Sequence, residues 1–195
     1  IVVTIAGIVY LAQNAPEEPG QTGRETSMQT DAQGATSATA RLEFGAGDLI
    51  VGATGGANIM EGEFSELAAR KVEVNYSASG GRGDLRINIA GEGLPFATGA
   101  NRNRWSIRLN KTIPLDLRIE AGLSSNDLDL SELKLSGLRV EAGLSSTKLR
   151  LPTSGDYEAR VSCGMSSTTI VIPEGVAARI RVQSGLSSVT IDEGR

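Results

Sequence analysis

Apolar and polar residues alternate along the last third of the chain, and the pattern returns every 21 residues. The clearest part of each repeat is Gly-Leu-Ser-Ser, with Met replacing Leu once, beginning at Gly122, Gly143, Gly164 and Gly185. The residues before each glycine alternate as a strand with one buried face requires, and the alternation resumes after the serines with shifted parity. Such a fixed short period is typical of a solenoid.

Three apolar columns, with one member in each repeat, are expected to point into the core. They lie three residues before each glycine (Ile119, Val140, Val161, Val182), one after it (Leu123, Leu144, Met165, Leu186) and six after it (Leu128, Leu149, Ile170, Ile191). The serine pair is expected at a corner, because short hydroxyl side chains bond nearby backbone groups and glycine permits a tight bend. A catalytic serine would need a nearby base, and the chain contains no His.

Upstream of the regular repeats, from residue 40, the pattern predicts less regular strands. Residues 41–49 resemble residues 139–144 and are interpreted as a degenerate copy of the repeat. A strand or bend is expected at 58–64, strands at 71–77 and 85–89, and a hairpin turn at 80–84. The expected fold is all-β, a single-domain β-solenoid (β-helix-like) with 21-residue turns over residues 111–195, preceded by an irregular β meander over residues 40–110.

Two motifs in the upstream part have alternative interpretations. Arg82-Gly83-Asp84 lies in the expected turn and can be an integrin ligand, but this tripeptide is common in glycine-rich turns, which is the interpretation favoured here. Trp105 follows basic residues that can meet a phosphate or sugar. Because residues 105–109 alternate, Trp105 is expected instead to point into the core.

The first 39 residues are expected to lie outside the folded domain. Residues 1–12 form an uncharged apolar run, shorter than the roughly 20 residues that span a bilayer. They are interpreted as the end of a transmembrane anchor, with a signal segment as the alternative. Residues 13–39 are polar and rich in small residues, which predicts a flexible linker. No basic cluster follows the apolar run, which favours an extracytoplasmic location for the domain.

Composition excludes several kinds of chemistry. A net charge of −4 gives no case for nucleic acid binding, and the single Cys163 shares a column with Ala121 and Ala142, so it is expected to pack in the core. With no His, no cysteine cluster and no phosphate-binding loop, we predict no catalytic residue, cofactor or metal site. A polysaccharide-active β-helix enzyme would need an acidic cleft, but the repeats place Lys148 and Arg150 after Asp127 and Asp129.

Several motifs together resemble a known family. They are residues 42–49 (Leu-Glu-Phe-Gly-Ala-Gly-Asp-Leu), the bend at 61–64, residues 105–109 followed by 114–117, and the Gly-Leu-Ser-Ser repeats. This set resembles the toast-rack β-solenoid domains, including the C-terminal domain of LiaF-type cell-wall-active antibiotic response proteins. The resemblance implies a membrane-tethered, extracytoplasmic domain of bacterial envelope proteins, some of which restrain two-component sensor kinases.

An outward column of arginines is the candidate surface for an anion or a partner. Its members are Arg118, Arg139, Arg160 and Arg181, with Arg179 close to the last. Strands stacked about 4.8 Å apart bring these like charges together at a cost on the order of 1 kcal/mol per pair in water. A solvated face is the simpler interpretation. A site for an anionic envelope polymer, a lipid headgroup or an acidic patch is the functional one, since guanidinium pairs well with phosphate and carboxylate.

These features predict a non-enzymatic, membrane-anchored binding or scaffold module. Its expected partner is another envelope or membrane protein, such as a sensor kinase, or an anionic envelope polymer. An adhesive or self-assembling structural module is the alternative. Glu193 takes the column of Leu130, Leu151 and Ile172, and a charge in a core column argues against end-to-end growth there.

Overall fold

The computed structural model describes residues 23–67, 71–90, 103–174, 179–184 and 188–193, and every regular element in them is a β-strand. The strands are β1 (Gly23–Asp31), β2 (Ser37–Thr54), β3 (Asn58–Leu67), β4 (Lys71–Ser79), β5 (Arg82–Ala90), β6 (Arg104–Asn110), β7 (Leu115–Asp129), β8 (Leu135–Arg150), β9 (Glu158–Cys163), β10 (Ser166–Ile172), β11 (Arg179–Ser184) and β12 (Ser188–Glu193). The predicted all-β, solenoid-like fold is confirmed.

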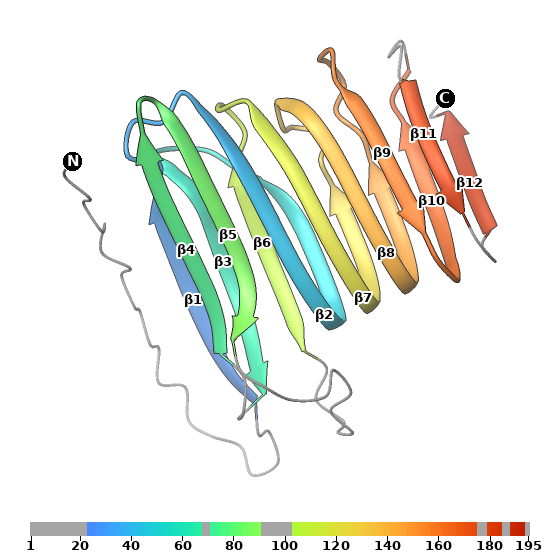
Figure 1. Cartoon of the computed structure of the whole chain (residues 1–195), viewed down its shortest axis with the longest axis horizontal. Helices are drawn as coiled ribbons and strands as arrows, with labels where there is room; N and C mark the ends of the chain where they lie inside the picture. Colours follow the sequence, from blue (N-terminus) through green and yellow to red (C-terminus); the bar gives the residue numbers. More distant parts are fainter. Residues whose placement is uncertain (1–22, 68–70, 91–102, 175–178, 185–187, 194–195) are drawn as a thin grey trace.

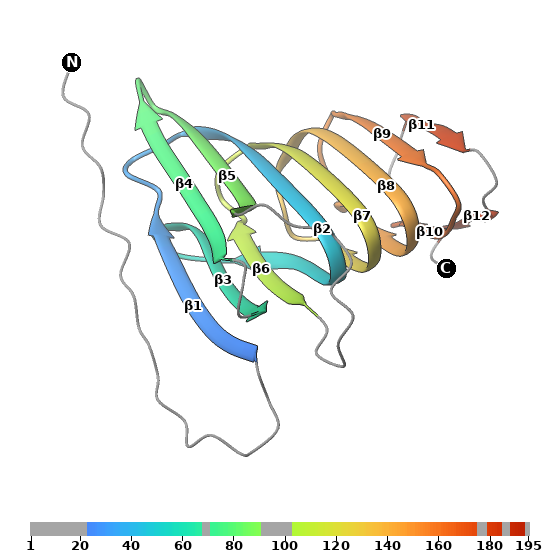
Figure 2. The same cartoon turned by 60° about the horizontal axis from the view of Figure 1, so that its bottom comes forward.

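The long strands β2, β7 and β8 each bend and contribute to two faces (Figures 1 and 2). Their first halves lie in one sheet, in the order β4-β5-β2-β7-β8-β9-β11. Their second halves lie in the other sheet, in the order β1-β3-β6-β2-β7-β8-β10-β12. The hydrophobic core fills the space between the two faces.

Parallel pairing confirms the 21-residue period of the repeats. Arg118 of β7 pairs with Arg139 of β8, which pairs with Arg160 of β9, and Arg160 pairs with Arg181 of β11. The degenerate copy is also confirmed, because Arg41 of β2 pairs with Arg118. The parallel stack therefore begins at β2, ahead of the predicted boundary at residue 111, and β3 to β6 are inserted between its first two long strands.

The predicted flexible linker over residues 13–39 is wrong in its second half. Strand β1 runs antiparallel to β3, and β2 already begins at Ser37. Met28, Ala32 and Ala38 are buried. The described part of strand β1 contains a single buried apolar residue, Met28, among polar ones, which is why this stretch looks like a spacer in the sequence. Residues 1–12 lie outside the described part of the chain.

No helix in the described part is both long and apolar enough to cross a membrane.

The predicted hairpin is confirmed between β4 and β5, but its turn is shorter than expected. Only Gly80 (φ 57°) and Gly81 (φ 76°) lie between the paired Ser79 and Arg82. Two successive residues with positive φ are typical of a tight hairpin turn. The Arg-Gly-Asp tripeptide that starts at Arg82 consequently belongs to strand β5 and not to the turn.

Trp105 is fully buried, as predicted. Its ring lies edge-on to Phe44, with centroids 5.0 Å apart, and to Phe64, at 5.6 Å. Such edge-to-face pairs add stabilisation beyond the burial of apolar area. The aromatic cluster joins β2, β3 and β6, so it fastens the inserted strands to the first strand of the stack.

One of the three predicted inward columns points outward instead. Leu123, Leu144 and Met165 are 45%, 48% and 55% exposed, while Leu186 lies outside the described residues. The sequence predicts that the alternation of buried and exposed residues shifts at the serine pair. In the structure the shift occurs one step earlier, at the Gly-Leu pair that begins at Gly122 and at its equivalents. Ala121 and Ser124 are both buried, so the glycine and leucine between them form the convex side of the corner.

The other two predicted columns are buried where the stack continues on both sides. Their fully or almost fully buried members are Ile119, Val140, Val161, Leu128, Leu149 and Ile170. Val182 is partly buried, and Ile191 on the last described strand is 51% exposed. Strand β12 pairs with β10 on one side only in the described part of the chain, which accounts for the exposure of Ile191.

The interior of the corner is polar. The Asn126 amide donates to the Thr147 hydroxyl at 2.9 Å, within the core. Cys163 is buried, as predicted, and its sulfur lies 3.2 Å from the hydroxyl of Thr168. The first serines of the next two pairs join these contacts, since the hydroxyls of Ser145 and Ser166 lie 3.3 Å from those of Thr147 and Thr168, whereas the hydroxyl of Ser124 is buried without a hydrogen-bond partner in the described part of the chain.

Close backbone stacking explains the glycine column. A Cβ added to Gly143 would lie 3.0 Å from the carbonyl oxygen of Gly122, and one added to Gly164 would lie 3.1 Å from that of Gly143. A Cβ on Gly122 would overlap the Gly45 carbonyl oxygen. Any larger residue must therefore push neighbouring strands apart at the corner.

We expect Gly122→Ala to destabilise the domain by about 1–3 kcal/mol, because the added methyl group overlaps backbone that cannot rotate away. Gly45→Ala is the matched control in the same column. It has open space around the new Cβ, and its stability should change by less than about 0.5 kcal/mol. Urea unfolding of both variants measures the difference. Equal destabilisation would contradict the stacking explanation.

Candidate binding surface

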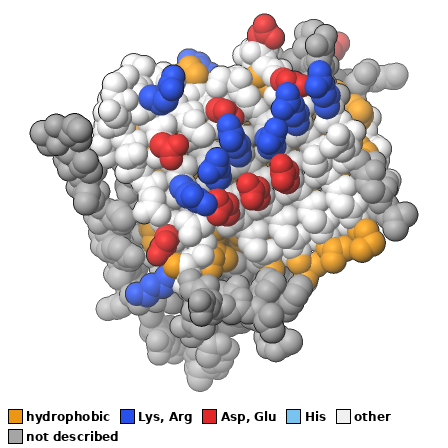
Figure 3. Space-filling view, viewed as in Figure 1, with side chains coloured by type: hydrophobic (Ala, Val, Ile, Leu, Met, Phe, Trp, Pro, Cys, Tyr) orange, Lys and Arg blue, Asp and Glu red, His pale blue; other side chains and the backbone are white. Residues whose placement is uncertain are grey.

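Six arginines form one row across the first sheet (Figure 3). In strand order from β5 to β11 they are Arg86, Arg41, Arg118, Arg139, Arg160 and Arg181, called the arginine ladder below. The structure thus brings four of the predicted site residues together and adds Arg41 and Arg86. Arg179 also lies on β11, but its side chain is outside the described part.

Only part of the ladder is neutralised by neighbouring carboxylates. Glu158 pairs with both Arg160, at 3.0 Å, and Arg181, at 3.2 Å. Asp116 pairs with Arg118 at 3.4 Å. At the other end of the ladder, Glu43 pairs with Arg86 at 2.6 Å.

Within the described part of the chain, two arginines inside the ladder have no carboxylate neighbour. Among the described residues, no carboxylate lies within 4.0 Å of Arg41 or Arg139. Arg139 is exposed and lines a hollow of about 300 Å³ with Arg118, Arg160 and the two carboxylates that pair with them. Gly137 also lines this hollow and, as a glycine, leaves it unfilled by a side chain. An anionic group could reach three guanidinium groups here.

A second row of side chains runs beside the ladder, two residues further along each strand. Glu43, Glu120 and Glu141 are paired in register on β2, β7 and β8. The row continues as Ser162 on β9 and Gln183 on β11. The acidic row therefore ends before the arginine ladder does, and Arg160 and Arg181 share Glu158.

On the opposite sheet, the basic residues that the repeats place after Asp127 and Asp129 are their register partners. Asp127 pairs in register with Lys148, and Asp129 with Arg150. The Arg150 guanidinium forms an ion pair with the Asp129 carboxylate, which also accepts hydrogen bonds from Ser131. Partial burial raises the pKa of Asp129, but the hydrogen bonds from Ser131 and the contact with Arg150 outweigh it, so the net pKa is lowered.

In the described residues, no three His, Cys, Asp or Glu side chains gather as a metal ion would require.

The fold and surface define a β-solenoid domain whose outer faces carry ladders of like residues. A family model described as the N-terminal domain of toast_rack (DUF2154) matches residues 18–171, so the chain belongs to this family. The resemblance to toast-rack domains inferred from the sequence is confirmed.

A solved structure shares the fold. The crystal structure of a Clostridium sporogenes protein, suggested to be a cell adhesion protein, superposes with a TM-score of 0.75. The match has 21% identity and covers 87% of this chain and 99% of the other. No curated protein matches this chain.

We expect stability to fall in acid partly through Asp129. Because its folded pKa is lowered, its stabilising contribution is present above the unfolded value of about 3.9 and is lost as the pH falls through the folded pKa. Asp129→Asn should therefore unfold at lower temperature than wild type at pH 7, with a smaller difference at pH 3. Thermal unfolding at both pH values measures this. A destabilisation independent of pH would show that the carboxylate charge is not involved.

Proposed function

We propose that this chain is a non-enzymatic binding module of a bacterial envelope protein, presented outside the cytoplasm, which contacts an acidic surface of another envelope or membrane protein. The observation that carries the proposal is the arginine ladder. Six guanidinium groups lie on adjacent strands at about 4.8 Å per step, so the ladder extends roughly 24 Å.

The arrangement of charge supports contact at the C-terminal part of the ladder. Arg160 and Arg181 share one carboxylate, and the neighbouring row is uncharged there, at Ser162 and Gln183. Arg139, beside them, has no carboxylate within 4.0 Å in the described part of the chain. Guanidinium groups form strong, directional hydrogen bonds with carboxylate and phosphate, so an acidic partner compensates the repulsion within the ladder.

The scaffold also supports a binding role. A rigid stack of strands holds the guanidinium groups at fixed spacing, so little backbone entropy is lost when a partner docks. Membership in the toast-rack family is consistent with the envelope location that the sequence resemblance implies. Restraint of a sensor kinase under envelope stress is one form of protein contact that the resemblance suggests.

Adhesion through an anionic envelope polymer is the second candidate. It is favoured by the shared fold with a protein suggested to act in cell adhesion, and by the regular spacing of the ladder, which suits a polymer with repeated anionic groups. The two candidates differ in partner and share the arginine ladder.

We expect Arg160→Gln/Arg181→Gln to weaken binding to the native partner at least tenfold, or about 1.4 kcal/mol. Binding of the purified chain to two fractions is measured at low and moderate salt: membrane proteins in detergent, and protein-free wall polymer. Binding to the first fraction supports protein contact, and binding only to the second supports adhesion.

Arg108→Gln/Arg150→Gln is the matched control for this test. It removes two exposed or half-exposed arginines of the opposite sheet, and each of them also has a carboxylate partner. This control should bind as wild type does. Unchanged binding by the Arg160→Gln/Arg181→Gln variant in both fractions would show that the arginine ladder is not the binding surface.

A further inference from the structure

A long open groove lies beside the corner of the stack, and the row of side chains next to the arginine ladder lines it. Its volume is about 870 Å³, and it crosses β5, β2, β7, β8, β9 and β11. The glycine column, at Gly45, Gly122, Gly143 and Gly164, lines it where side chains are missing. Of the residues that the structure describes, no arginine lines it.

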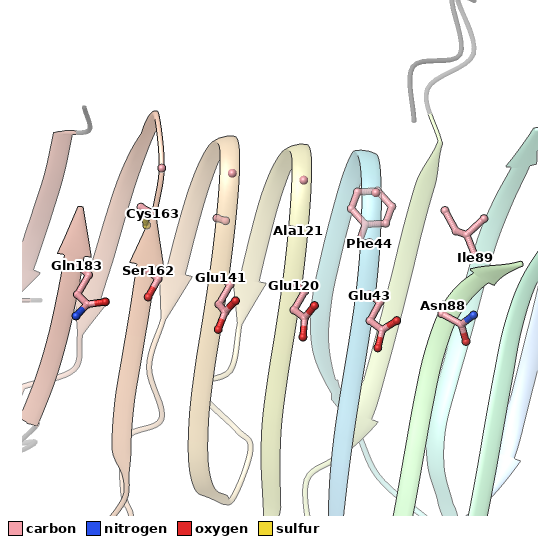
Figure 4. Close-up of a pocket in the computed structure, with 15 residues that line it drawn as sticks. Glu43, Phe44, Asn88, Ile89, Glu120, Ala121, Glu141, Ser162, Cys163 and Gln183 are labelled. Carbon is pink, nitrogen blue, oxygen red and sulfur yellow. The ribbon is translucent and has the colours of Figure 1, made fainter. Parts of the chain in front are cut away.

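One wall of the groove carries carboxylates on three adjacent strands, and one of them, Glu43, is ion-paired with Arg86. Figure 4 shows Glu43, Glu120 and Glu141 side by side, followed by the uncharged Ser162 and Gln183. Among the described residues, no lysine or arginine lies within 4.0 Å of Glu120 or Glu141. Stacked carboxylates repel one another, so this wall favours a cationic occupant.

An apolar ridge lies one residue beyond the glycine column that lines the groove. Leu123, Leu144 and Met165 each follow a glycine of the column and are about half exposed. Figure 3 shows a row of hydrophobic side chains along one edge of the molecule. The glycines are required by backbone stacking, but nothing in the packing requires large apolar residues on the convex side of the corner. The exposed ridge is therefore unexplained by the fold.

We propose that this groove binds an amphipathic helix of a partner polypeptide, with basic side chains against the acidic wall and apolar side chains against the ridge. Successive turns of a helix are about 5.4 Å apart, close to the strand spacing of about 4.8 Å, so each turn meets one strand. The charges of the acidic wall and the basic helix are complementary, and the carboxylates would repel an anionic lipid surface.

The size of the ridge also favours a single helix over a second copy of this chain. A stable protein interface buries about 800 Å² on each partner. Three half-exposed side chains beside the groove form a strip rather than a broad face. A helix that lies in a groove uses such a strip through residues spaced three and four apart.

The test uses fluorescently labelled synthetic helices of about 18 residues, long enough for five turns. One peptide has lysines on one side and leucines on the other, the second has glutamates in place of the lysines, and the third has the first composition in scrambled order. Fluorescence anisotropy with the full chain should show salt-sensitive binding of the first peptide and at least tenfold weaker binding of the other two.

Variants of the chain locate the site. Glu120→Gln/Glu141→Gln and Leu123→Ser/Leu144→Ser should each weaken binding of the basic helix at least tenfold. The charge control is Glu63→Gln/Asp127→Asn, which removes two exposed carboxylates of the opposite sheet and should bind normally. Because all these side chains are exposed, thermal unfolding should change little.

The outcomes separate this proposal from the others. Arg160→Gln/Arg181→Gln should leave helix binding intact, so failure of the arginine ladder and failure of the groove can be told apart. Binding of the basic helix that survives Glu120→Gln/Glu141→Gln, or equal binding of the acidic helix, would overturn the proposal. Tighter binding of the chain to vesicles containing anionic lipid than to the basic helix would also overturn the proposal, if the vesicle binding depended on Leu123 and Leu144.

Discussion

The fold depends on close, in-register stacking of parallel backbone at the corner of each coil. Hydrogen bonding fixes adjacent strands about 4.8 Å apart, and a 21-residue repeat then sets each residue beside its equivalent in the next coil. At the corner the backbones approach so closely that a Cβ on Gly143 would lie 3.0 Å from the Gly122 carbonyl oxygen. The glycine column is therefore the condition for the regular stack.

The same register determines what the surface can do. It places arginine beside arginine and glutamate beside glutamate, which is unfavourable within the domain but produces rows of guanidinium and carboxylate groups with regular spacing. The missing side chains of the glycine column leave a groove between the acidic row and the apolar ridge. The proposed contacts with an acidic partner and with a basic helix both follow from these rows.

Much of this architecture could be predicted from the sequence, because a fixed period carries information about register. The period identified the stack, the arginines of its regular coils and the buried Val140 and Leu149 columns. Periodicity did not distinguish inward from outward at the corner, so Leu123 was assigned to the core. Arg86 joins the ladder through a hairpin that shares no repeat, and β1 is an edge strand with few large apolar residues.

Disulfide trapping of adjacent coils tests the in-register stack most directly. In a Cys163→Ala background, Ser125→Cys/Ser146→Cys joins exposed residues that are register partners on β7 and β8. We predict rapid disulfide formation under mild oxidation for this pair. Ser125→Cys/Ser167→Cys places the thiols two strands apart, roughly 10 Å, beyond the distance of about 7 Å that a disulfide can bridge. Equal or faster crosslinking of this second pair would contradict the in-register stacking of adjacent coils.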